Sequence, residues 1–170
     1  MERKTEFIDH TTNWYKGENF EGGMLIIWGV LMVVLALYFW KFSYYDVSRV
    51  LVVPILVVGL FWGIAAGYGL IRNKQRLEKA KIEYKENPDT FIKNENKRVG
   101  GFFKYYRYLL PGWSVLIIIG LAVFIFMGGN QIRAIGIAII LFSVAGLMVD
   151  HTSEQNAKKY HLEIEKELLK

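Results

Sequence analysis

The sequence predicts an all-α membrane protein: a four-transmembrane-helix bundle with a cytoplasmic helical hairpin and interfacial helices at both termini. Three observations support this fold class. The 170 residues are 53% hydrophobic and 22% charged, four long segments contain no charged residue, and the basic residues gather between those segments. Four spanning helices and their connections use most of the chain, so we predict a single polytopic membrane domain over residues 1–170.

Three of the charge-free segments have 19 to 23 residues and the fourth has 16, all close to the length that crosses a bilayer. A helix rises about 1.5 Å per residue, so about 20 residues span the roughly 30 Å hydrocarbon core. The segments are Gly22–Trp40, Val50–Ile71, Leu109–Gln131 and Ala134–Val149. We place the spans at residues 22–40, 50–71, 109–128 and 132–149. The start of the chain has no apolar signal-peptide core, so we expect the first span to direct insertion.

The basic residues predict the orientation. Eighteen of the 21 Lys and Arg residues lie before the first span, between the second and third spans, or after the fourth. Basic loops remain in the cytoplasm. We therefore predict a multi-pass protein of the cytoplasmic (inner) membrane with both termini inside. Arg98, Lys104 and Arg107 lie among aromatic residues beside the third span and are predicted to contact anionic lipid headgroups, whereas nucleic acid is not expected as a partner.

Small residues predict where the spans touch. Gly59, Gly63 and Gly67 are four residues apart in the second span, so they share one helix face. In lipid, such a face lets another helix approach closely. A matching stripe in the first span contains Gly22, Gly29 and Ala36. We expect these two faces to pack against each other.

The segments outside the spans also favour helices. The predicted helices are an interfacial helix over 3–17, an extension of the second span to residue 86, a cytoplasmic helix over 88–108 and an amphipathic C-terminal helix over 152–170. Gly17 is expected to end the first of these. Asn87 and Pro88 stop one helix and start the next, because the residue before a proline disfavours the helical conformation. Gly100 and Gly101 are expected to break or loosen the helix that contains them.

The composition argues against several kinds of chemistry. Between their interfaces the spans contain no Asp, Glu, Lys, Arg or His, which ion-coupled transporters need inside the membrane, and Arg133 lies at the outer end of the fourth. The absence of cysteine excludes disulfides and thiolate sites. The sequence also has no glycine-rich phosphate loop and no HExxH or nucleophile-elbow motif. We therefore expect no cofactor and no enzymatic activity.

One repeated sequence pattern is compatible with a metal-binding site. Asp9-His10-Thr11 precedes the first span and Asp150-His151-Thr152 follows the fourth. The predicted topology puts both segments at the cytoplasmic interface, where two imidazoles and two carboxylates would suit Zn²⁺. Further ligands would be Glu6 or Glu154. The alternative is that these polar residues cap helix ends or face the lipid headgroups.

Three functions are compatible with this architecture. The first is a non-enzymatic accessory or scaffold subunit that associates with itself or with another membrane protein. The second is a homo-oligomeric channel or passive transporter, and the third is a protein that binds a metal or a lipophilic cofactor. The sequence favours the first, because no pattern identifies a transport path or a reaction centre.

The charge asymmetry generates a test of topology. A reporter fused after Lys170 is expected to be cytoplasmic, and one inserted near Tyr45 external, because 18 basic residues lie on one side and three on the other. Protease accessibility in inverted and right-side-out vesicles measures both positions. Either reporter on the opposite side would contradict the predicted orientation.

Overall fold

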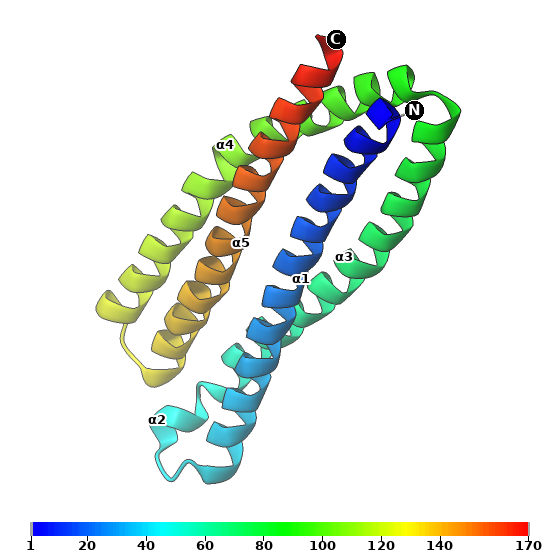
Figure 1. Cartoon of the computed structure of the whole chain (residues 1–170). Coiled ribbons are helices and arrows are strands. Elements are labelled where there is room, and N and C mark those ends of the chain that lie inside the picture. The colour runs from blue at the N-terminus through cyan, green and yellow to red at the C-terminus, as the bar shows by residue number, and fades with distance from the viewer. Residues whose placement is uncertain (1, 170) are drawn as a thin grey trace.

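The computed structural model describes residues 2–169 and shows four long helices with one short helix between the first two (Figure 1). The helices are α1 (Glu2–Phe42), α2 (Asp46–Arg49), α3 (Val52–Glu86), α4 (Pro88–Phe126) and α5 (Asn130–Leu168). No strand occurs in this range. The predicted all-α four-helix bundle is confirmed.

The bundle consists of two antiparallel hairpins. α1 packs mainly on α3, and α4 packs mainly on α5, while α1 and α5 form the larger contact between the hairpins. Figure 1 shows both termini and the α3–α4 connection at one end of the bundle, with α2 and the α4–α5 connection at the other. The α3–α4 connection is tight: the Asn87 side chain accepts a hydrogen bond from the Thr90 N–H at 3.0 Å, and Pro88 begins α4.

The long helices divide the bundle into two halves. The charged half comprises residues 2–21, 72–108 and 150–168, and the apolar half comprises residues 22–71 and 109–149. All four long helices contain an apolar window long enough to cross a membrane. Large apolar side chains point outward over much of the apolar half, as expected where the surroundings are lipid rather than water.

The main hydrophobic core lies in the charged half. All four long helices contribute to it, and aromatic rings fill much of its volume. Its buried members are Phe7, Trp14, Tyr15, Ala80, Tyr84, Phe91, Ile92, Val99, Ala157, Tyr160 and Ile164. Two smaller clusters lie in the apolar half. The charged half therefore packs like a water-soluble four-helix bundle.

The predicted helix end at Gly17 and the predicted break at Gly100 and Gly101 are wrong. α1 runs without interruption through Gly17 and Gly22, and α4 runs through Gly100, Gly101 and Pro111. The first two glycines make room for neighbouring helices: a Cβ at Gly17 would lie 3.0 Å from the Asn156 side chain, and one at Gly22 would lie 2.8 Å from Leu70. A single proline removes only one backbone donor, which a membrane helix tolerates.

The terminal helices are consequently not separate interfacial helices. The face of α1 that carries Phe7, Thr11 and Trp14 is buried in the bundle rather than laid on the lipid surface. The apolar face of the predicted amphipathic C-terminal helix is likewise buried, at Ala157 and Ile164. Both segments continue a spanning helix, and burial among three other helices satisfies their apolar faces.

Glycines form the closest helix contacts in the apolar half. A Cβ added to Gly29 would lie 2.7 Å from the Gly59 carbonyl oxygen and 2.8 Å from the Gly63 nitrogen. A second contact of this kind joins α4 to α5, where a Cβ on Gly120 would lie 2.9 Å from the Gly136 carbonyl oxygen. Both hairpins thus bring backbone against backbone where glycine alone leaves the space.

The other predicted packing residues differ in how they contribute. Ala36 is fully buried and packs in the cluster that contains Ile55 and Val58 of α3. By contrast, a Cβ at Gly63 or Gly67 would meet no atom within 4 Å. The backbone of Gly63 is part of the contact, but its own side-chain position is open.

This geometry predicts different stabilities for alanine variants at two of these glycines. Gly29→Ala is expected to lose on the order of 1–3 kcal/mol of stability, because its Cβ would meet rigid backbone. Gly67→Ala, the matched control, is expected to be neutral or slightly stabilising, since alanine is the better helix former. Thermal unfolding in detergent, followed by circular dichroism, measures both. Equal midpoints for the two variants would show that the Gly29 contact does not hold the hairpin together.

Candidate functional site

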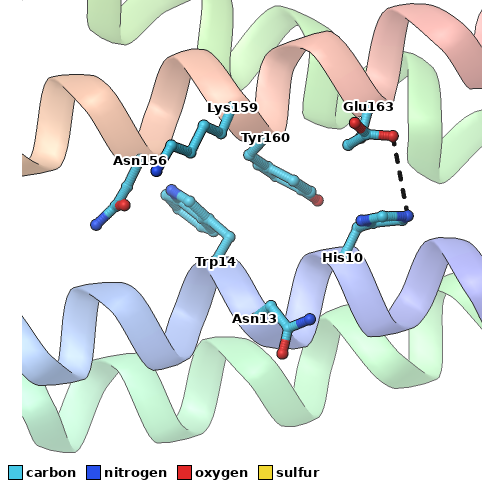
Figure 2. Close-up of a pocket in the computed structure, with 7 residues that line it drawn as sticks. All are labelled: His10, Asn13, Trp14, Asn156, Lys159, Tyr160 and Glu163. Atoms are coloured by element: carbon cyan, nitrogen blue, oxygen red, sulfur yellow. Dashed lines mark ion pairs between the residues drawn. The ribbon is translucent and has the colours of Figure 1, made fainter.

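The candidate site is a cavity of about 430 Å³ between α1 and α5 in the charged half (Figure 2). It lies where the two hairpins meet. Three lining residues come from α1 and four from α5: His10, Asn13, Trp14, Asn156, Lys159, Tyr160 and Glu163. The regular 3–4 residue spacing of a helix brings these side chains to the facing sides of the two helices.

An ion pair lies at one end of the cavity. The His10 Nε2 is 3.9 Å from a Glu163 carboxylate oxygen, and Figure 2 shows the two side chains reaching toward each other across the gap. Glu163 also accepts from the Lys166 ammonium at 2.7 Å. The carboxylate of the cavity is therefore already engaged by the Lys166 ammonium and lies close to the His10 ring.

Two stacked aromatic residues form the wall of the cavity. The rings of Trp14 and Tyr160 are 5.2 Å apart and nearly parallel, at 10°. Both residues are buried. The Arg98 guanidinium lies 4.5 Å from the centre of the Trp14 ring. This cation–π contact and the ring stacking fix the position of the indole.

A buried polar network lies behind this wall. The Tyr160 hydroxyl donates to Glu95 at 3.1 Å and is 2.9 Å from the Thr11 hydroxyl. Arg98 donates to both oxygens of Glu95, at 2.9 and 2.6 Å. Burial raises the pKa of Tyr160 above its ordinary value, and the nearby Glu95 carboxylate raises it further. Tyr160 consequently stays protonated at neutral pH and acts as a donor.

A second cavity of about 310 Å³ lies at the boundary between the two halves. Its polar side contains Glu18, Glu21 and Asp150. Burial raises the pKa of Glu18 to about 7, opposed by the positive charge of Arg98. The other two carboxylates accept hydrogen bonds, Glu21 from Asn156 and Asp150 from the Trp113 indole at 2.6 Å.

The two Asp-His-Thr segments do not come together. His10 contacts Glu163, which follows His151 by 12 residues on α5, or about 18 Å along the helix. His151 is exposed and shares a hydrogen bond with Gln155. Asp9 is exposed, the Glu6 side chain lies outside the described set, and Glu154 pairs with Lys158. Among the described residues, no group of three or more His, Asp or Glu could hold a metal ion.

Arg98 occupies a different place from the one predicted. Its guanidinium is bonded to Glu95 inside the bundle rather than presented to lipid headgroups. Lys104 and Arg107 are exposed on α4, as are the neighbouring Tyr105 and Tyr108. Headgroup contact by these two basic residues stays a prediction.

Comparison with known proteins gives no match: no family model, no curated protein and no solved structure is significantly similar to the chain. The assignment therefore depends on the chain's own architecture. Four apolar helices of this length are those of a small multi-pass integral membrane protein.

The buried ion pair generates a stability prediction. Arg98→Leu is expected to lose about 3–5 kcal/mol, because it leaves Glu95, only 7% exposed, buried without its cation. The double variant Glu95→Leu/Arg98→Leu is expected to recover much of that loss, since no buried charge remains. Thermal unfolding in detergent measures this cycle.

Arg107→Leu is the matched control, because Arg107 is an exposed basic residue on the same helix. It is expected to change stability by less than about 0.5 kcal/mol. If Arg98→Leu behaved like Arg107→Leu, the ion pair would have no structural role in solution.

Proposed function

We propose that the protein is a non-enzymatic accessory or scaffold subunit of a membrane assembly, oriented with its charged half in the cytoplasm. The observation that carries this proposal is the contrast between the two halves. The charged half has a dense aromatic core and a buried ion pair. The apolar half leaves most of its surface to the membrane.

The most accessible spanning helix is α4. Only 6% of its apolar window is buried, compared with 22 to 33% in the other three long helices. Ile118 and Ile125 lie seven residues apart on its outward face and are 64% and 59% exposed. Helices associate in lipid through close packing, so an unpaired face of this length suits contact with another membrane protein.

The channel alternative has less support. Apart from Arg133 at the outer end of the fourth, the spanning segments have no Asp, Glu, Lys, Arg or His side chain to line a conduction path. Two polar groups there are used within the bundle: Ser143 donates to the Ile139 carbonyl at 2.7 Å, and the Trp62 indole donates to the Phe142 carbonyl at 3.2 Å. A rigid subunit that positions a partner fits these observations better.

The exposed residues at the base of α4 support the orientation. Lys104 and Arg107 alternate with Tyr105 and Tyr108 immediately before the apolar window. Tyrosine favours the membrane–water interface, and basic residues near it attract anionic lipids of the cytoplasmic leaflet. This belt would hold α4 at a fixed depth while its outward face meets a partner.

Native mass spectrometry after extraction in mild detergent tests the proposal. The expected result is a complex of defined stoichiometry, heavier than the 19.7 kDa chain. The double variant Ile118→Trp/Ile125→Trp is expected to release the single chain, because two bulky indoles would separate the helices. Ile64→Trp is the control, since Ile64 is 69% exposed on α3.

Two results would count against the proposal. If the wild-type chain is extracted alone under every mild condition, there is no assembly to which it belongs. If Ile64→Trp dissociates the complex and the α4 variant does not, then α4 is not the contact face.

A further inference from the structure

The two hairpins are packed less tightly against each other than each is within itself. Within the described residues, cavities of about 310, 330, 430 and 590 Å³ all have walls from both hairpins. Each hairpin, by contrast, is closed by a backbone contact between glycines, Gly29 with Gly59 and Gly120 with Gly136. Regions with few packed contacts open at the lowest cost in free energy. Movement in this bundle is therefore easiest between the hairpins.

Glu18 lines the smallest of these cavities, at the boundary between the two halves. Its Oε2 oxygen is buried and has no hydrogen-bond partner among residues 2–169. A buried carboxylate needs donors to balance the loss of water, and a charged group left without them costs more than a neutral one. The closed cavity therefore favours the protonated carboxyl group.

Groups on α1, α4 and α5 face Glu18 without stabilising its charge. The neighbouring carboxyl groups are Glu21 on the same helix and Asp150 of α5, which lines the same cavity. The hydroxyls of Tyr15 on α1 and Tyr106 on α4 also lie within its electrostatic reach. In their ionised forms both carboxylates would repel an ionised Glu18, and Asp150 would do so across the interface between the hairpins.

Groups on α3 and α4 favour ionisation of Glu18, but none of them bonds its Oε2 oxygen. Arg98 of α4 is already bonded to both oxygens of Glu95, and Arg76 of α3 is exposed. The Asn73 side chain on α3 acts in the same direction. Burial outweighs all three and raises the pKa of Glu18 to about 7. This carboxyl group therefore titrates near neutral pH.

From this geometry we propose that Glu18 is a pH-sensitive switch in the interface between the hairpins, which is closed while the carboxyl group is protonated and opens to water when the proton is released. An ionised carboxylate needs donors that the closed cavity does not supply, so water must enter. Water is close, because Glu18 precedes the first span by four residues, or about 6 Å. Repulsion by Asp150 acts in the same direction, since the two residues belong to different hairpins.

The raised pKa sets the sign of the pH effect. Between about 4.3, the ordinary pKa of a glutamate, and about 7, the folded chain holds a proton on Glu18 that the unfolded chain has lost. The resulting stabilisation is fully present below the lower value and is lost as the pH rises through the upper one. The switch does not involve the contact face on α4 and does not depend on the proposed assembly.

The first test measures the access of water to the cavity with a single thiol. The chain has no cysteine, and a Cβ at Gly69, which lines the cavity, would meet no atom within 4 Å. Gly69→Cys is introduced alone and together with Glu18→Gln, which mimics the protonated carboxyl group. The full chains are placed in phosphatidylcholine nanodiscs, and labelling by an anionic methanethiosulfonate reagent is timed at pH 6 and pH 8.

The labelling rate with Glu18 intact is divided by the rate in the Glu18→Gln background. This ratio is expected to rise at least threefold from pH 6 to pH 8. Ionisation of the thiol itself cancels in the ratio. An ionised Glu18 would also raise the pKa of the thiol and repel the reagent, and both effects act against the expected rise. A ratio that stays constant or falls would overturn the proposal.

Thermal unfolding of the chain without added cysteine gives a second measurement. From pH 5.5 to pH 8, the midpoint of the wild type is expected to fall by at least about 3 °C more than that of Glu18→Gln. Glu86→Gln is the matched control, because Glu86 is an exposed glutamate on α3, and it is expected to follow the wild type. If Glu18→Gln also followed the wild type, Glu18 would not titrate in the folded chain. If the midpoints differed but the labelling ratio stayed constant, ionisation would leave the interface closed, and either result would refute the switch.

Discussion

Within a bilayer, apolar side chains gain nothing by leaving lipid for protein, and this constraint explains how the bundle is held together. Helix association there must come from close packing. The chain supplies it at two backbone contacts, Gly29 with Gly59 and Gly120 with Gly136. Outside the membrane, the hydrophobic effect operates fully, and there the chain places its large aromatic core. The apolar half is therefore held together by close packing, and the charged half by the hydrophobic effect.

The joint between the hairpins depends on Trp14. Its ring is covered by Tyr160 from α5 and by the Arg98 guanidinium from α4. Arg98 is in turn held by Glu95, and Glu95 accepts from Tyr160. Three helices thus meet in one closed set of contacts. A buried network of this kind favours a single arrangement of the helices, because any shift leaves a charge or hydroxyl unpaired.

The sequence was sufficient for the fold class, since four charge-free segments leave few alternatives in a membrane. It was insufficient for the helix boundaries. Gly17 and Gly22 give the same local signal whether they end a helix or admit a neighbour, and only the positions of Asn156 and Leu70 distinguish the two cases. The bond between Glu95 and Tyr160 joins residues 65 positions apart, a pairing that no local pattern predicts.

The prediction that the two Asp-His-Thr segments meet was wrong because the course of α1 was wrongly predicted. Topology assigned residues 9 and 150 to the same end of the bundle but did not fix their depth. Asp9 precedes the first span by 13 residues, whereas Asp150 directly follows the fourth. With an interfacial helix lying flat on the membrane, the two would be level. Once α1 is a continuous rod, they are separated by about 18 Å along the bundle.

Because α1 is one continuous helix, a small tilt of its spanning part produces a large displacement at its N-terminal end. From the Gly29 contact to its first residue, the helix extends over 27 residues, or about 40 Å. A 5° change in the tilt of the span would move that end by about 3.5 Å, close to the width of an atom. A close-packed core does not absorb such a displacement. A change in the tilt of the α1 span relative to its neighbours would therefore disturb the packing around Phe7 and Trp14, far from the apolar half.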